Sequence, residues 1–116
     1  ETIIIYDHGQ KEFVIDFEKA STNEELVYPC GKYGKPLTSG NLKQTVPYVL
    51  EKKQVLNLNI LVDKSVIEIF VNGDLCIVQR VYPAREDSQE VRLFTKDHQV
   101  KIRNVIKWDM EATNPW

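Results

Sequence analysis

The chain has 116 residues, and its 15 Lys and Arg against 17 Asp and Glu give a formal net charge of −2. That length fits one domain with a hydrophobic core of useful size. The near-neutral charge argues against a basic nucleic-acid-binding surface. No apolar run approaches the roughly 20 residues of a membrane-spanning helix. We therefore expect neither nucleic acid nor a membrane as a partner.

The composition is rich in β-branched residues. Val, Ile and Thr together make up 29 of the 116 residues, and only 3 residues are Ala. Branched side chains pack well on a pleated sheet and lose rotameric freedom in a helix. The composition therefore predicts an all-β fold.

The first half of the chain contains two segments with strand character. Residues 2–7 form an apolar, β-branched run, residues 7–10 read as a turn, and Phe13, Ile15 and Phe17 then alternate with more polar neighbours. The chain enters the first run directly at Glu1, so we expect a processed chain or a piece of a longer protein. The Gly- and Pro-rich residues 18–53 predict a long connection, with short edge strands near residues 26–28 and 48–50.

The second half alternates more clearly. Even-numbered apolar residues over 56–62 share one face of a strand, residues 63–65 form a tight turn, and odd-numbered residues over 67–71 share a face of the next strand. Asn72-Gly73 predicts a type I′ hairpin turn, in which both residues need positive φ. A return strand over 75–82 ends at Pro83.

Two further strands are predicted over residues 91–95 and 100–108. Trp108 shares its phase with Ile102 and Ile106, which favours packing in the core. With these, the alternation predicts about eight strands and no helix, as in an antiparallel β-sandwich.

Few residues in the sequence suggest a catalytic or metal-binding site. Asp63 and Glu68 flank one turn, and a glycosidase needs two carboxyls about 5–9 Å apart. The preferred interpretation is that Asp63 caps the turn and Glu68 is a solvated or paired strand residue. His8 and His98 read as turn residues without metal-ligand spacing, so no cofactor or metal is expected. Cys30 and Cys76 allow one disulfide, but nothing in their spacing requires it, and free thiols are preferred.

Aromatic residues offer a second interpretation. A platform for stacking sugar rings is conceivable from the six residues Tyr28, Tyr33, Tyr48, Tyr82, Trp108 and Trp116. Trp116 lies beyond the last predicted strand. It is equally compatible with a disordered end and with an anchor against a neighbouring domain.

Residues 58–73 read LNILVDKSVIEIFVNG. This run resembles the signature of the C-terminal β-sandwich module of glycoside hydrolase family 32, and the resemblance is strongest over residues 55–110. Lys64 stands where the family usually has Arg. The residues that match the family's signature and its later R-x-Y-P segment are Asp63, Ser65, Glu68, Phe70, Asn72, Gly73, Arg80 and Pro83.

The resemblance implies a lectin-like, concanavalin-type jelly roll that lacks its first strands here. It also implies a β-fructosidase parent: an invertase, levanase, inulinase or sucrose-6-phosphate hydrolase. The family's catalytic carboxylates lie on an N-terminal five-bladed propeller, in the motifs W-M-N-D-P-N-G, R-D-P and E-C. None of these motifs occurs in this chain. The chain alone is therefore expected not to be an enzyme, and the matching residues are expected to be structural.

Two functional hypotheses follow from the resemblance. The first is that residues 1–116 are a single non-catalytic module that packs against the propeller and stabilises it. The alternative is a lectin-like carbohydrate-binding module, in which Tyr48, Tyr82 and Trp116 contact an oligosaccharide or the neighbouring domain. Exposed sheet edges, above all the apolar residues 2–6, also predict a homodimer.

Overall fold

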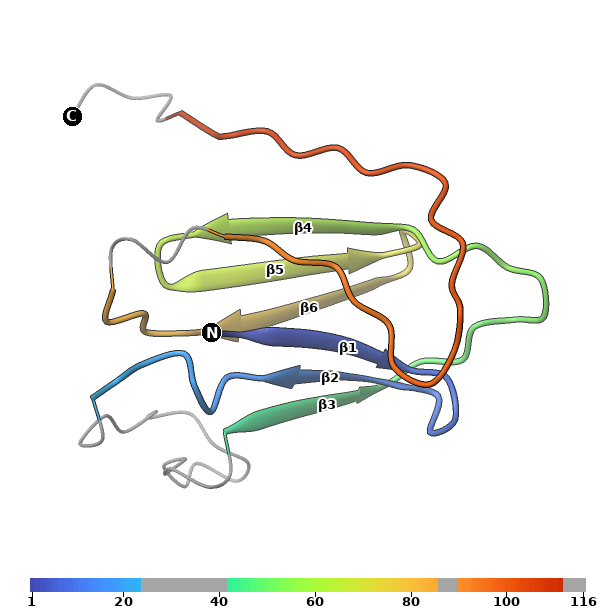
Figure 1. Ribbon diagram of the computed structural model, residues 1–116, viewed down its shortest axis with the longest axis horizontal. Helices are drawn as coiled ribbons and strands as arrows, with labels where there is room; N and C mark the ends of the chain where they lie inside the picture. The colour runs from blue at the N-terminus through green and yellow to red at the C-terminus, as the bar shows by residue number, and fades with distance from the viewer. Residues whose placement is uncertain (24–41, 86–89, 112–116) are drawn as a thin grey trace.

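The computed structural model describes residues 1–23, 42–85 and 90–111, and its regular secondary structure there is entirely β (Figure 1). Six strands form two antiparallel sheets of three strands each. Among the described residues, no helix is long and apolar enough to cross a membrane. The predicted all-β sandwich is confirmed. The strands are Ile3–Asp7 (β1), Glu12–Asp16 (β2), Lys43–Pro47 (β3), Leu58–Asp63 (β4), Val66–Val71 (β5) and Leu75–Arg80 (β6).

The first sheet has the strand order β1-β2-β3. On its central strand β2, Phe13 and Ile15 are completely buried, while the alternate residues Glu12, Val14 and Asp16 are half-buried. Ile4 of β1 lies opposite Ile15, and Tyr6 lies opposite Phe13. Because directly opposed residues share a face of the sheet, these side chains form one inward row.

The second sheet has the strand order β4-β5-β6. The three β-branched residues Ile67, Ile69 and Val71 on β5 are buried and point inward, as the alternation predicts. Glu68 and Phe70 lie between them and therefore point to the outer face. The neighbouring strands continue the inward row, since Ile69 is opposite Ile60 on β4 and opposite Ile77 on β6.

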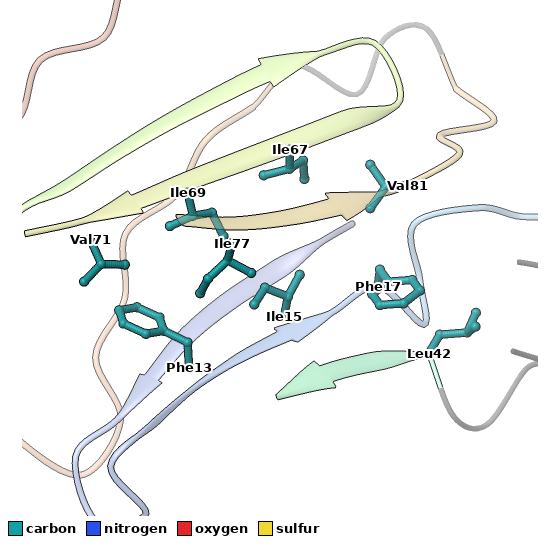
Figure 2. Close-up of a cluster of buried hydrophobic side chains, with 9 residues drawn as sticks. All are labelled: Phe13, Ile15, Phe17, Leu42, Ile67, Ile69, Val71, Ile77 and Val81. Carbon is teal, nitrogen blue, oxygen red and sulfur yellow. The ribbon is translucent and has the colours of Figure 1, made fainter. Parts of the chain in front are cut away.

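The core lies where the inward rows of the two sheets meet. Figure 2 shows the side chains of the first sheet facing those of β5 and β6. Full burial of one such side chain contributes about 1.5–3 kcal/mol relative to exposure, so these residues hold the sheets together. The core consists of Phe13, Ile15, Phe17, Leu42, Ile67, Ile69, Val71, Ile77 and Val81.

The hairpin turns follow the local sequence. Lys64 and Ser65 alone connect β4 to β5, and Lys64 has a φ of 47°. At the β5–β6 turn, Asn72 has a φ of 50° and Gly73 a φ of 77°. The positive φ predicted at both residues is confirmed. Because Val71 pairs with Leu75, Asp74 is a third connecting residue, and its N–H donates to the Val71 carbonyl over 3.1 Å.

The edge strand predicted near residues 48–50 is wrong in position. The strand observed is β3, Lys43–Pro47, which pairs with β2. Pro47 lacks an N–H and ends the strand at the sheet edge, where a missing donor is tolerated. Tyr48 then donates its N–H to the Lys11 carbonyl, and Leu50 donates to the Tyr6 hydroxyl instead of to a ladder. The strand predicted near residues 26–28 lies outside the described residues.

The two strands predicted over residues 91–95 and 100–108 are also not formed. Residues 90–111, here called the arm, have no strand pairing. In Figure 1 the arm first crosses the view of the sheets and then runs back beyond β4. Trp108 is 59% exposed, which contradicts the predicted core packing. Alternation predicts an extended chain, but a strand also needs a neighbour for its backbone hydrogen bonds. The described part of the chain pairs no strand with the arm, so six strands are observed there against about eight expected.

The strand β4 is only partly covered. Its inward-facing side chains Leu58, Ile60 and Val62 are 38%, 41% and 61% exposed, although their partners on β5 are buried. In Figure 1, β4 is the strand of the second sheet farthest from the first sheet. The sandwich therefore has an uncovered apolar margin along β4.

Candidate functional site

The eight signature residues do not converge on one point. Asp63 and Ser65 lie at the β4–β5 end of the second sheet, and Asn72 and Gly73 lie at its opposite end. The Ser65 carbonyl accepts the N–H of Val81 over 2.9 Å, so Arg80 and Pro83 lie toward the Ser65 end. Glu68 and Phe70 lie between the two ends on the outer face. The eight residues are spread over β5, its two flanking turns and the end of β6 rather than gathered at one place.

The candidate carboxylate pair lies on an open sheet surface. Asp63 is opposite Val66, and Glu68 is opposite Leu61, so the two acids are diagonal neighbours on the outer face. Asp63 is exposed beside the turn, and Glu68 is half-buried. A glycosidase holds the sugar between its two carboxyls, whereas these side chains project from one side of a sheet. This geometry favours the interpretation without catalysis, and Asp63 is the last residue of β4, directly before the turn.

A shallow hollow of about 410 Å³ lies on the outer face of the first sheet. Within it, the Lys43 ammonium contacts the Asp16 carboxylate over 3.0 Å. Partial burial alone would raise the pKa of Asp16, but the Lys43 ammonium, the Glu18 N–H and the charge of Lys19 lower this pKa below its ordinary value. The hollow is lined by Glu1, Ile3, Asp16, Glu18, Lys19 and Lys43.

The clearest constructed polar arrangement joins the two sheets through Tyr48. Asn72 Nδ2 donates to the Tyr48 hydroxyl over 2.9 Å, and this hydroxyl donates to Asp74 Oδ1 over 3.2 Å. The other side of the Asn72 amide is also held, because Oδ1 accepts the N–H of Asn57 over 2.7 Å. Tyr48 follows β3 of the first sheet, whereas Asn72 and Asp74 form the β5–β6 turn. We call this arrangement the inter-sheet tie.

The Tyr48 ring is packed as well as hydrogen-bonded. Its centroid is 5.8 Å from that of Phe13 and 6.4 Å from that of Tyr6. Burial raises the pKa of the Tyr48 hydroxyl, the Asp74 carboxylate adds to the rise, and the Asn72 hydrogen bond opposes it. The hydroxyl therefore stays protonated at neutral pH and can donate to Asp74. The sequence singles out Tyr48 only as an aromatic, and its partners are fixed by the approach of the two sheets.

The aromatic residues do not form a single platform in the described part of the chain. Tyr48 lies at the Asn72 end of the second sheet, and Tyr82 follows β6 at the other end. Both are half-buried, and Tyr82 packs against the core. Trp108 lies on the arm. The remaining three candidates, Tyr28, Tyr33 and Trp116, lie outside the described residues.

The other candidate residues are dispersed. Cys76 is a free, exposed thiol on β6, and Cys30 lies outside the described residues. His8 is exposed in the β1–β2 turn, with its ring edge-on to Tyr6 at a centroid distance of 6.3 Å. His98 is exposed on the arm. Within residues 1–23, 42–85 and 90–111, no group of three or more His, Cys, Asp or Glu side chains is placed to hold a metal ion.

Comparison with known proteins identifies the family of this chain. Residues 1–109 match the family described as "Glycosyl hydrolases family 32 C terminal". Among curated proteins, the chain is similar to "Beta-fructofuranosidase, insoluble isoenzyme 3" of Oryza sativa subsp. indica, with 33% identity over 103 residues. The protein of the same description in Oryza sativa subsp. japonica gives the same identity over the same length.

These relatives are much longer than this chain. The similarity covers 81% of the present chain but only 18% of each rice protein. No solved structure matches the chain. The match over nearly its whole length, together with the all-β sandwich, shows that the chain belongs to the family of C-terminal domains of family 32 glycosyl hydrolases.

Proposed function

We propose that this chain is a non-catalytic module that packs against the catalytic propeller of a β-fructosidase and stabilises it. The observation that carries the proposal is the apolar surface left uncovered on β4 and the arm. Family membership and similarity to a beta-fructofuranosidase supply the class of the parent enzyme. The dispersion of the signature residues supports a role without catalysis.

The arm has the pattern of a surface covered by another domain. Its even-numbered apolar side chains over residues 100–110 are 54–67% exposed. Basic residues occupy several of the alternate positions, among them Lys101, Arg103 and Lys107. Large exposed apolar patches rimmed by polar residues mark interaction surfaces. The residues of this apolar row are Val100, Ile102, Ile106, Trp108 and Met110.

A matched pair of variants in the parent protein tests this surface. Ile102→Ser removes an apolar contact from the row, and Lys101→Ser changes the neighbouring basic position. Ile102→Ser should lower the melting temperature of the parent protein, and Lys101→Ser should leave it nearly unchanged. Equal effects of the two variants would contradict the proposed contact.

Absence of catalysis has its own test. The isolated chain should release no fructose from sucrose, inulin or levan, because both carboxyls of the candidate pair lie on an open sheet surface. Fructose release that persists through purification and disappears in Asp63→Asn or Glu68→Gln would overturn the proposal. Binding of a fructan without turnover would instead support the lectin-like alternative.

We also propose that the isolated chain self-associates through β1. This strand is at the edge of the first sheet, and Ile5 on its outer face is 37% exposed. Unpaired edge strands pair readily with a second copy, and an edge lysine opposes such pairing. Ile5→Lys should therefore reduce the mass measured by sedimentation equilibrium. We substitute Ile5 rather than its neighbour Ile4, because Ile4 packs against the core. A wild-type mass fixed at 13.5 kDa at every concentration would contradict the proposal.

A further inference from the structure

We propose that Asn72 is a latent deamidation site whose reaction is held back by the inter-sheet tie. The inference is independent of the proposed function, because it rests on the Asn72-Gly73 turn and its hydrogen bonds. In an Asn-Gly sequence, the backbone nitrogen of Gly attacks the side-chain carbonyl carbon of Asn. Glycine favours this attack because it carries no side chain that would obstruct the ring closure.

The reaction balances with water as its only co-reactant. A bond forms between the Gly73 nitrogen and Asn72 Cγ, the bond from Cγ to Nδ2 breaks, and ammonia leaves with the proton of the Gly73 amide. Water then opens the resulting succinimide. Cleavage of the bond between the Gly73 nitrogen and Cγ gives aspartate. Cleavage of the bond between this nitrogen and the backbone carbonyl carbon of residue 72 gives isoaspartate, which adds a methylene group to the backbone of the turn.

The nucleophile is accessible in the folded chain. Gly73 is exposed, and a Cβ built on it would meet nothing within 4 Å. Its N–H has no hydrogen-bond partner within the part of the chain that the structure describes. The turn therefore leaves the attacking nitrogen unprotected, and any protection must come from the Asn72 side chain.

That side chain is restrained on both sides of its amide. Oδ1 accepts the Asn57 N–H over 2.7 Å, and Nδ2 donates to the Tyr48 hydroxyl over 2.9 Å. The Asn72 backbone is held as well, because its N–H donates to the Asn57 carbonyl over 2.9 Å. Rotation of the amide toward the Gly73 nitrogen requires these side-chain hydrogen bonds to break. The hydrogen bond to Tyr48 persists only while the two sheets stay together.

Deamidation would in turn weaken the tie. A carboxylate at position 72 can still accept the Asn57 N–H, but it has no donor for the Tyr48 hydroxyl. It would also place a second negative charge beside this hydroxyl, which already donates to Asp74. One modification event would thus loosen the link between the sheets irreversibly.

The test compares the deamidation rate of Asn72 in four samples by peptide mapping and mass spectrometry at mildly alkaline pH. These are the native chain, the urea-unfolded chain, Tyr48→Phe and the control Tyr82→Phe, which removes a hydroxyl at the other end of the sheet. The native chain should react much more slowly than the unfolded chain. Tyr48→Phe should react about two- to tenfold faster than the native chain, as expected for the loss of one hydrogen bond.

Circular dichroism at the incubation temperature shows whether each variant is folded. A native rate equal to that of the unfolded chain would overturn the proposal. So would a folded Tyr48→Phe variant that reacts no faster than wild type, or a Tyr82→Phe control accelerated to the same extent. If Tyr48→Phe does not fold, Asn72 in the native chain must still react more slowly than in the unfolded chain.

Discussion

Asn72 in the β5–β6 turn donates a hydrogen bond of 2.9 Å to the hydroxyl of Tyr48, which follows β3 in the other sheet. The two residues are 24 positions apart in the chain. The same hydroxyl donates a hydrogen bond of 3.2 Å to Oδ1 of Asp74 in the same turn. A polar contact therefore supplements the apolar core in fixing how the two sheets meet.

A double-mutant cycle measures this contact. Asn72→Gly removes the donor without adding a charge and tolerates the positive φ, and Tyr48→Phe removes the hydroxyl. The two changes should show a coupling free energy of about 0.5–1.5 kcal/mol in urea unfolding. Strictly additive effects would mean that the hydrogen bond contributes nothing to stability.

The backbone of Gly73 gives a second prediction. Its φ of 77° lies in the left-handed region, where a β-branched residue is strained. Gly73→Val should lower the free energy of unfolding by about 1–3 kcal/mol. Gly73→Asn is the matched control, because Asn tolerates this region. Thermal melts that place Val and Asn together would show that the strain argument is wrong.

Gln44 is an opportunity for stabilisation. It lies opposite Ile15 on the inward face of β3, and its Oε1 atom is buried without a hydrogen-bond partner in the described structure. A buried unsatisfied polar atom costs about 1–3 kcal/mol. Gln44→Met should therefore raise the free energy of unfolding, whereas Thr45→Val on the exposed face should change it little. A loss of stability in Gln44→Met would indicate that the amide makes a favourable contact.

The ion pair of Asp16 and Lys43 predicts a pH dependence. The pKa of Asp16 is lowered from 3.8 in the folded chain, so the pair stabilises the fold above that pH. This contribution is lost as the pH falls through the lower folded pKa. Asp16→Asn should reduce stability at neutral pH by about 0.2–1 kcal/mol, the range for exposed pairs.

The difference between Asp16→Asn and wild type should disappear at strongly acidic pH, where both side chains are neutral. Lys43→Gln should reproduce the same pH dependence from the other partner. A difference that stays constant across the acid range would show that the effect of Asp16→Asn is not electrostatic.

Sequence patterns correctly predict the structural features that depend only on residues close together in the chain. The alternation around Phe13 and Ile15 predicts β2, the alternation around Ile69 predicts β5, and Asn72-Gly73 predicts the positive φ of the turn. Each of these depends only on side-chain periodicity or backbone sterics. The family signature likewise predicts the class of domain that the comparisons identify.

Features that depend on distant neighbours could not be predicted. The alternation around Ile102 and Trp108 is that of a strand. A strand also needs a neighbouring strand for its backbone hydrogen bonds, and the sequence pattern does not show which segment would supply it. β3 begins earlier than its predicted position because its pairing with β2 sets its limits. The link from Tyr48 to Asn72 arises only when two sheets approach, so Tyr48 resembles any aromatic residue in the sequence.

The stability of the parent enzyme tests the central claim most directly. The melting temperature of the catalytic domain should be measured in three samples. The first has residues 1–116 attached, the second lacks them, and the third is the second with the isolated chain added. If the chain is a stabilising module, removal should lower the melting temperature of the catalytic domain, and addition of the chain should restore part of the loss. An unchanged melting temperature in all three samples would contradict the account.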